Sequence, residues 1–488
     1  KMADLPWISV EEVERHSKPE SCWLVVNTQV WDLTEFTPNH PGGAEVIYRY
    51  AGCDATTEYN AIHAPSLLLD TLTSTKLVGK LETGINIPEQ WRITSTNNSK
   101  DSRPKPPLET LINAHDFERA ASRDFSQKAW AYYSSAATDL ITLNANKSFL
   151  DRIWFRPRVL RNVRNVDLRI RILGSTDLFL PFFVSPAAMA RLAHPEGERA
   201  IAAACSAKNV AQCVSTNASF PLKEIAKDTK HPIFFQLYVD NSREKSESLL
   251  RVCHEVGVKA IFVTIDTPMA GKREADERVR TNQSISTPMS GVTAKNDAKG
   301  GGLARTMGNF IDMSLNWDDL KWLRSVTHLP IILKGIQSAA DAQLAMQHDV
   351  QGIMISNHGA RNLDTSPPSI LVLLELHKCC PEIFDTLEVY LDSGIRRGTD
   401  ILKALCLGAT AVGIGRPFLY SLNYGREGIE HLIEILRDEL VTSMRMLGVT
   451  ELSQLHPGLV NTLQIDDAVP GTVGHPYARW RRVLQAKV

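Results

Sequence analysis

The 488-residue sequence lacks several features that would assign a protein to a class at once. None of its eight cysteines lies in a Cys-x-x-Cys pair, which disfavours zinc-ribbon, thioredoxin-like and covalent c-type haem sites. No apolar run approaches the roughly 18 residues that a membrane span needs. The formal net charge is −1, so neither a nucleic-acid-binding nor an anionic-membrane surface is indicated. An apolar content of 43% and a charged content of 22% are typical of a globular protein of this size with two or three domains.

Changes in composition divide the chain into four parts. Residues 1–82 form a compact block with short apolar patches. Residues 83–107 combine a polar run with several prolines, which predicts an exposed linker. Residues 108–469 form a second, large block, whose polar, glycine-rich insert at 281–309 is predicted to be a mobile lid or a disordered segment. Residues 470–488 are predicted to be a C-terminal tail of the kind that docks on a neighbouring subunit.

Short apolar runs recur through the large block with mostly helix-length spacers. There are eight: Leu180–Val184, Val210–Val214, Ile233–Leu237, Ala260–Ile265, Pro330–Leu333, Gly352–Ile355, Leu387–Leu391 and Ala411–Ile414. Apolar strands alternating with helices are typical of a parallel sheet covered on both faces. Eight in roughly 250 residues predict an α/β fold of the (β/α)₈ barrel type. A doubly wound open sheet is the alternative, but no glycine-rich turn follows the first run.

The sixth run leads into Ser356-Asn357-His358-Gly359-Ala360-Arg361. An imidazole and a guanidinium three residues apart at a strand end can take a proton from a substrate hydroxyl while binding its carboxylate. The alternative is that His358 caps a loop and Arg361 is a solvated surface charge. The other strand ends decide between the two interpretations.

Nearly every other predicted strand also ends in a polar or ionisable residue. In chain order these residues are Tyr238, Asp266, Arg273, Lys334, Asp392, Gly394, Arg396, Gly415 and Arg416. Each has an ordinary structural explanation: Tyr238 as a core ring, Asp266 as an N-cap, Lys334 as a surface charge. Because barrel chemistry lies at the C-terminal ends of the strands, we expect the set to form one site. The loops after the last two strands are where such barrels commonly bind phosphate.

The large block closely resembles the FMN-dependent enzymes that oxidise α-hydroxy acids, such as glycolate oxidase and mandelate dehydrogenase. The resemblance rests on Ala131-Tyr132-Tyr133-Ser134-Ser135, Phe155-Arg156-Pro157-Arg158, Gln236-Leu237-Tyr238, Thr264-Ile265-Asp266, Ser356 to Arg361, Asp392 to Asp400 and Gly413 to Tyr420. Several long motifs in the right order make the resemblance specific.

The first block resembles cytochrome b5, an α+β haem domain. His40-Pro41-Gly42-Gly43 is followed by Ala51-Gly52-Cys53-Asp54-Ala55-Thr56 and then by His63. The resemblance implies that His40 and His63 ligate a non-covalent haem b from both faces, an arrangement suited to electron transfer. The order of the two blocks resembles the flavocytochrome branch of the family, in which electrons pass singly from FMN to haem and on to a soluble cytochrome c.

The resemblance also implies a role for each site residue. Arg361 and Tyr132 would bind the substrate carboxylate, with Arg273 as a second cation. His358 would accept the hydroxyl or α-carbon proton, oriented by Asp266. The remaining side chains implied in catalysis or FMN binding are Tyr238 on the hydroxyl, Lys334 beside the flavin, and Ser215, Gln236, Thr264, Asp392, Gly394, Arg396, Gly415 and Arg416 around FMN.

The implied reaction is oxidation of an L-2-hydroxy acid, with L-lactate to pyruvate as the leading hypothesis. A different acid, such as mandelate or glycolate, and an electron carrier with an impaired barrel remain alternatives. The resemblance further implies a homotetramer in the mitochondrial intermembrane space, although residues 1–6 have no targeting-peptide character. Three residues depart from the family pattern: Asn362 stands where Gln is usual, Ser393 where Gly is usual, and Asn217 where a large apolar side chain is usual. Asn217 is expected to face the substrate's side chain.

Overall fold

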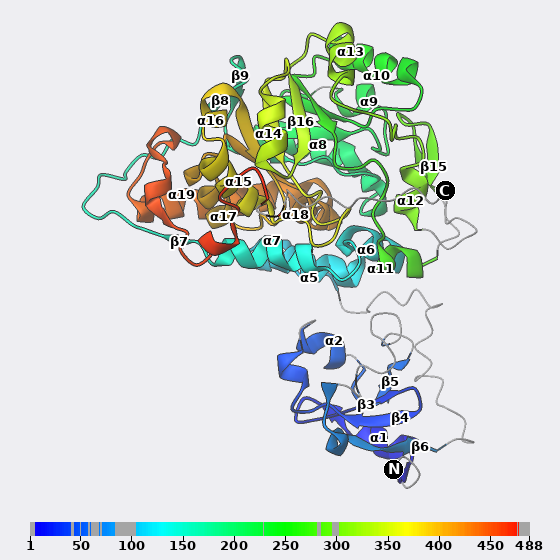
Figure 1. Ribbon diagram of the computed structural model, residues 1–488. Coiled ribbons are helices and arrows are strands. Elements are labelled where there is room, and N and C mark those ends of the chain that lie inside the picture. Colours follow the sequence, from blue (N-terminus) through cyan, green and yellow to red (C-terminus); the bar gives the residue numbers. More distant parts are fainter. Residues whose placement is uncertain are drawn as a thin grey trace. The chain divides into compact units, whose positions relative to one another are not determined.

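The computed structural model describes residues 5–40, 43–48, 50–56, 59, 68, 71–82, 104–227, 229–280, 285–294, 302–475 and 477. Contacts divide the chain into two compact units, Lys1–Lys100 and Asp101–Val488 (Figure 1). In the part of the chain that the structure describes, no helix combines the length and apolarity needed to cross a membrane.

The N-terminal unit is built on a six-stranded mixed sheet. Its order is β1 (Trp7–Ile8), β6 (Leu77–Leu81), β4 (Gln29–Asp32), β3 (Ser21–Val26) and β2 (Ser17–Lys18), with β5 (Cys53–Asp54) pairing with β3. Helix α1 (Val10–Arg15) begins at Ser9, whose side chain accepts a hydrogen bond from the Glu12 amide. The buried Trp31 and Leu24 anchor the core against α2 (Ala44–Tyr48).

The large unit contains a closed parallel barrel, which confirms the predicted (β/α)₈ fold. The strands in barrel order are β10 (Phe182–Val184), β11 (Ala211–Ser215), β12 (Ile233–Leu237), β13 (Ala260–Thr264), β16 (Ile331–Ile336), β17 (Gly352–Ile355), β18 (Glu388–Leu391) and β19 (Ala411–Ile414). Each overlaps one of the eight apolar runs. The boundaries of β10, β11, β13, β16 and β18 differ from the predicted ones by one to three residues, most at β16, which continues two residues past Lys334 with a register shift between Lys334 and Ile336.

Helices surround the barrel in Figure 1. Those on the strand-to-strand connections are α8 (Gly197–Lys208), α9 (Leu222–Ile225), α10 (Arg243–Glu255), α11 (Glu274–Arg278), α12 (Leu303–Met307), α13 (Asp319–Val326), α14 (Ala339–Ala345), α15 (Ser369–Cys379), α16 (Ile383–Thr386) and α17 (Gly398–Cys406). Before and after the barrel come α5 (Ala114–Asp124), α6 (Gln127–Ser134), α7 (Ile141–Asp151), α18 (Arg416–Ser421) and α19 (Gly425–Leu447).

The structure describes parts of the predicted linker, insert and tail. The linker's last residues contact the barrel unit, where Lys105 Nζ donates to the Asn423 carbonyl at 2.8 Å and Tyr424 donates to that of Pro106 at 2.9 Å. In the insert region, β14 (Ile285–Thr287) and β15 (Val292–Ala294) form an antiparallel hairpin, and α12 (Leu303–Met307) follows. Residues 83–103, 281–284, 295–301, 476 and 478–488 lie outside the described residues.

Aromatic rings fill the barrel interior. Phe183 packs against Phe234 and Tyr390, and Phe234 against Phe262, with centroids 5.4–6.1 Å apart. All four side chains are fully buried. Because the interior is filled rather than hollow, the strand ends form a rigid platform for the side chains that follow them.

Phe262→Ala should therefore lower the free energy of unfolding of the barrel unit by about 3–5 kcal/mol, because the ring leaves a cavity that the closed barrel cannot fill. Denaturant unfolding of the full chain, followed by far-ultraviolet circular dichroism, measures the change. Phe179→Ala is the matched control, since that ring is 52% exposed. Equal destabilisation by the two variants would contradict the packing described.

Candidate active site

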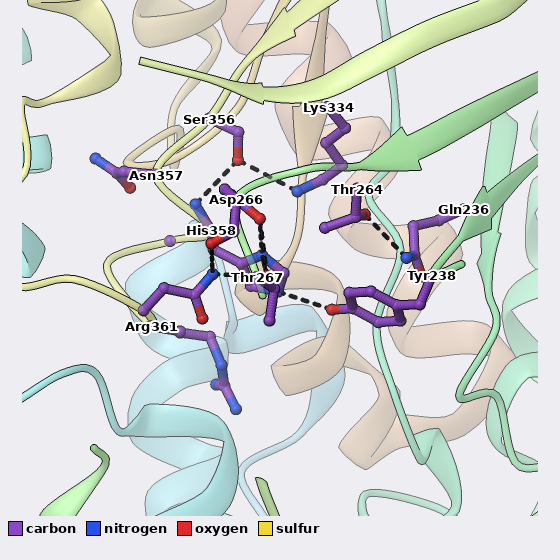
Figure 2. Close-up of polar contacts among 12 residues, drawn as sticks. Gln236, Tyr238, Thr264, Asp266, Thr267, Lys334, Ser356, Asn357, His358 and Arg361 are labelled. Atoms are coloured by element: carbon purple, nitrogen blue, oxygen red, sulfur yellow. Dashed lines mark hydrogen bonds and ion pairs between the residues drawn. The ribbon is translucent and has the colours of Figure 1, made fainter. Parts of the chain in front are cut away.

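The C-terminal ends of the barrel strands bring most of the predicted side chains around one cavity (Figure 2). The predicted residues that line it are Tyr132, Ser215, Gln236, Tyr238, Thr264, Arg273, Lys334, His358, Arg361, Asp392, Gly394, Arg396, Gly415 and Arg416. Asp266 lies directly behind His358, bonded to its ring. The side chains that sequence reasoning placed on the barrel are thus together, although their roles remain predictions.

The central contact is between His358 Nδ1 and Asp266 Oδ1, which are 2.9 Å apart. Burial lowers the pKa of His358 below its usual value, and the Asp266 charge only partly offsets this. Burial would raise the pKa of Asp266, but His358 and Lys334 outweigh it and keep that pKa low. The pair is therefore a neutral imidazole beside an ionised carboxylate, with the Nδ1 hydrogen directed at Asp266. The lone pair of Nε2 then points toward the cavity as a general base.

The Asp266 side chain reaches His358 across the intervening strand β16. Gly335 of that strand leaves the space, since a Cβ there would lie 2.6 Å from Asp266 Cβ and 2.7 Å from its Cγ. Gly335 also has a φ of +117°, which other residues rarely adopt. A residue larger than glycine at position 335 would therefore collide with Asp266, whose carboxylate must pass there to reach the His358 imidazole.

The His358 loop is held in an uncommon backbone conformation. His358, Gly359 and Ala360 have φ values of 58°, 63° and 64°, all in the left-handed region. Side chains outside the loop hold it, because Ser356 Oγ accepts from the His358 amide and Ser393 Oγ from the Gly359 amide, each at 3.0 Å. Ser393, a departure from the family pattern, thus ties the loops after β17 and β18 together.

Tyr238 faces the other nitrogen of the base. Its hydroxyl lies 3.3 Å from His358 Nε2 (Figure 2). Burial raises the pKa of Tyr238, so the phenol stays protonated and can donate a hydrogen bond. With Nδ1 protonated, the phenol donates to Nε2, so a substrate hydroxyl placed beside this pair would replace that contact and meet one donor and one acceptor.

Lys334 brings a positive charge to the barrel mouth. Its Nζ lies 3.2 Å from Ser356 Oγ and 3.8 Å from Asp392 Oδ2. Burial lowers the pKa of Lys334, but the carboxylates of Asp392 and Asp266 outweigh it and leave the pKa above its usual value. The ammonium is therefore fixed and available to stabilise negative charge.

Guanidinium groups line another part of the cavity wall and have no carboxylate partner among the described residues. Arg361 donates to the carbonyls of Tyr132 and Tyr133, at 2.9 and 3.0 Å, and stacks over the Tyr132 ring. Arg273 donates to the Arg361 carbonyl, and burial together with the charge of Arg361 lowers its pKa to about 10. Arg416 has its pKa lowered to about 10 for the same reasons. Arg273 is buried and Arg361 and Arg416 are half-buried, and cations in such positions without anionic partners indicate a site built for anionic ligands.

The residues predicted to hold FMN fit a flat heterocycle with a phosphate. Ser215 Oγ donates to Gln236 Oε1 at 3.0 Å, and Gln236 Nε2 donates to Thr264 Oγ1 at 2.9 Å, a buried polar row across three adjacent strands. At Gly413 a Cβ would lie 2.3 Å from Ser185 Oγ, which is itself buried and without a partner among the described residues. The donor set and the close backbone approach agree with the predicted cofactor.

The phosphate end is formed by the loops after β18 and β19. Arg416 donates to the carbonyls of Tyr133, Ser135 and Gly359, which hold its guanidinium at the wall. Arg396 is paired with Glu118 at 3.0 Å. These contacts orient two cations of the predicted phosphate site before any ligand binds.

Two further residues complete the network around the base. Thr267 Oγ1 lies 2.9 Å from Asp266 Oδ1 and 3.1 Å from His358 Nδ1. Asn362 Nδ2 donates to the Asp266 carbonyl at 2.9 Å and to Thr267 Oγ1 at 2.7 Å. Sequence reasoning missed Thr267, whose only signal is its position after Asp266. Asn362, noted only as a departure, belongs to this support for Asp266.

In the N-terminal unit, the structure describes one of the two predicted haem ligands. His40 Nδ1 lies 3.2 Å from the Gly43 carbonyl and donates to it. This bond leaves the lone pair on Nε2, the arrangement that a metal-ligating histidine commonly has. His63 lies outside the described residues, so the ligand pair remains a prediction.

Comparison with known proteins assigns the class that this geometry defines. The family model of the FMN-dependent dehydrogenases matches residues 121–462, and that of the cytochrome b5-like haem/steroid binding domain matches residues 9–82. The chain belongs to the FMN-dependent dehydrogenase family and carries a cytochrome b5-like domain. The predicted cofactors, FMN and haem, and the predicted enzyme class are thereby confirmed.

Individual relatives match either the whole chain or its barrel block. The chain is 41% identical to the L-lactate dehydrogenase (cytochrome) of Saccharomyces cerevisiae over 96% of this chain and 81% of that protein. It is 39% identical to the glycolate oxidase of Spinacia oleracea, over 71% of this chain and 94% of that protein. The recombinant flavin-binding domain of baker's yeast flavocytochrome b2 superposes with a TM-score of 0.67 at 40% identity, covering 78% of this chain and 95% of that one. The similarity to the L-lactate dehydrogenase (cytochrome) thus spans both blocks, and the similarity to the flavin-binding domain of flavocytochrome b2 covers the barrel block.

Asp266→Asn should lower kcat/KM by about 10²–10⁴-fold, because the imidazolium formed on proton uptake loses its carboxylate. The Asp266 charge raises the pKa of His358, so its removal should move the acid limb of the pH profile to lower pH. Steady-state rates from pH 4.5 to 9 measure both effects.

Asp177→Asn is the control for this substitution, because Asp177 pairs with Arg171 on the exposed surface. An acid limb that stays in place or moves to higher pH in Asp266→Asn would show that Asp266 does not act on His358.

Proposed function

We propose that the barrel oxidises an L-2-hydroxy acid, with L-lactate to pyruvate as the leading reaction, and that electrons leave singly through haem b to cytochrome c. The observation that carries the proposal is the joint placement of two cations, the buried Arg273 and the half-buried Arg361, without a carboxylate partner among the described residues, and a neutral, carboxylate-backed imidazole. A carboxylate ligand neutralises the former, and an adjacent hydroxyl presents its proton to the latter.

Substrate binding follows from the two sides of the cavity. The carboxylate of the acid pairs with Arg361, with Arg273 and Tyr132 beside it. The hydroxyl lies beside His358 Nε2 and the Tyr238 phenol, where the phenol orients it and the imidazole takes a proton from the hydroxyl or the α-carbon. Since both groups come from packed strand ends, the acid is aligned without a large rearrangement of the site.

Asp266 stabilises the imidazolium that results, and Thr267 and Asn362 hold Asp266 in place. FMN, when bound, accepts the two electrons that the acid loses as it becomes a 2-oxo acid and two protons. Lys334 supplies the fixed positive charge that favours this reduction.

The remaining predicted residues are assigned to the cofactors. Ser215, Gln236 and Thr264 bind the flavin ring. The ribityl phosphate part of FMN is bound by Asp392, Gly394, Arg396, Gly415 and Arg416. Haem b in the segment 1–82 is held by His40 and His63, on a chain whose linker is 83–107 and whose barrel domain is 108–469.

The proposal extends to partners and location. The names of the relatives support cytochrome c as acceptor, and by family resemblance the enzyme acts in the mitochondrial intermembrane space. A homotetramer is supported by the long loop after β7 (Trp154–Phe155), drawn in cyan at the left of Figure 1. Val159 and Leu160 in this loop are 81% and 102% exposed, and a neighbouring subunit would cover such side chains.

Anaerobic addition of L-lactate to the full chain should bleach the flavin absorbance and then bring up the bands of reduced haem. His358→Gln should slow flavin bleaching by at least about 10²-fold, because the base is lost. His40→Ala should leave flavin bleaching intact and abolish haem reduction. Stopped-flow absorbance separates the two events.

Unaltered haem in the wild-type chain after the flavin bleaches would contradict the proposed electron path. No bleaching with L-lactate, glycolate or mandelate would contradict the oxidation of 2-hydroxy acids itself.

A further inference from the structure

Asn217 is a polar side chain in the cavity wall that the proposed mechanism does not use. It follows β11 at the same rim as Tyr238 and His358 and lines the same cavity. Only 4% of the residue is exposed. A buried carboxamide at this position faces whatever occupies the cavity.

The carboxamide oxygen of Asn217 has no hydrogen-bond donor in the part of the chain that the structure describes. The backbone of the residue is fixed on both sides, because its amide donates to Ser215 Oγ at 3.1 Å and its carbonyl accepts from the Met189 amide at 3.0 Å. The residue therefore cannot shift outward to reach a partner. A buried polar atom without a hydrogen-bond partner is rare in folded proteins, unless a bound ligand supplies that partner.

The position of Asn217 relative to Tyr238 determines which part of a substrate it meets. The Tyr238 amide donates to the hydroxyl of Thr216, the neighbour of Asn217, at 3.1 Å. On the proposed function, the carboxylate lies at Arg361 and the hydroxyl beside Tyr238 and His358. The side chain on the α-carbon is then the substituent left for the part of the cavity wall that Asn217 lines, together with the small Ala187 and Ala188.

We propose that Asn217 favours an L-2-hydroxy acid whose side chain carries a neutral hydroxyl, the 2,3-dihydroxy acid class, over the isosteric acid with an apolar side chain. This inference rests on the proposed function. A carboxamide both donates and accepts, so a hydroxyl can satisfy it. A second carboxylate would be buried beside an uncharged group and is disfavoured. An ethyl side chain, of the same length as a hydroxymethyl group, would leave the carboxamide without a partner.

The isosteric pair L-glycerate and L-2-hydroxybutanoate tests the proposal, because the two differ only in OH against CH₃. Wild-type kcat/KM should be about 10–100-fold higher for L-glycerate, since the apolar acid leaves a buried polar group unpaired. Asn217→Leu should reverse the order, and Asn144→Leu, on the exposed face of α7, should leave the wild-type ratio unchanged.

Binding to the oxidised protein provides a readout that needs no turnover. Titration calorimetry with hydroxypyruvate and 2-oxobutanoate, the matching 2-oxo acids, should show the same preference and the same reversal. Asn217→Ala removes the carboxamide without adding bulk, so it should abolish the preference even if the leucine variant does not fold.

An unchanged ratio in Asn217→Leu and Asn217→Ala would overturn the inference while leaving the proposed function intact. If neither of these acids nor L-lactate bleaches the flavin, the proposed function fails instead, so the two failures are distinguishable.

Discussion

The hydrogen bond between Asp266 and His358 is the contact on which the rest of the site depends. Its two residues follow strands that are not neighbours, and only a closed barrel with a glycine in the strand between them lets the side chains meet. The bond fixes the imidazole tautomer, and the surrounding burial keeps the ring neutral. The left-handed loop at 358–360 and the support from Thr267 and Asn362 serve to hold this one geometry.

The charges around that bond divide the cavity into regions of different chemistry. Lys334 and Asp392 stand at the barrel mouth, where a flavin ring would lie, and Arg361 and Arg273 stand on the wall that would bind a carboxylate. Because the guanidinium groups donate to backbone carbonyls instead of carboxylates, their charge is directed but not neutralised. The positive charge that would bind the substrate is therefore already in place in the folded chain. The packing of the barrel offsets the free-energy cost of holding these cations there.

The sequence was sufficient for the fold and for most of the site because both depend on periodic signals. Eight apolar runs predicted eight strands, and residues just after them were predicted to share one rim. Lys334 shows the limit, because a register shift that no sequence pattern marks places it inside β16. Thr267 shows another, since a threonine after an aspartate is common and only its distance to His358 reveals its part. Asn217 was noticed as a departure, but its unpaired carboxamide is visible only once its neighbours are placed.

The central claim is that His358 is neutral, with its hydrogen on Nδ1 toward Asp266 and its lone pair on Nε2 toward the cavity. Neutron diffraction from crystals of the oxidised protein at pH 7 tests this directly, because it locates hydrogen atoms that X-rays do not show. We predict nuclear density for a hydrogen between Nδ1 and Asp266 and none on Nε2. A hydrogen on Nε2, alone or together with one on Nδ1, would contradict the account.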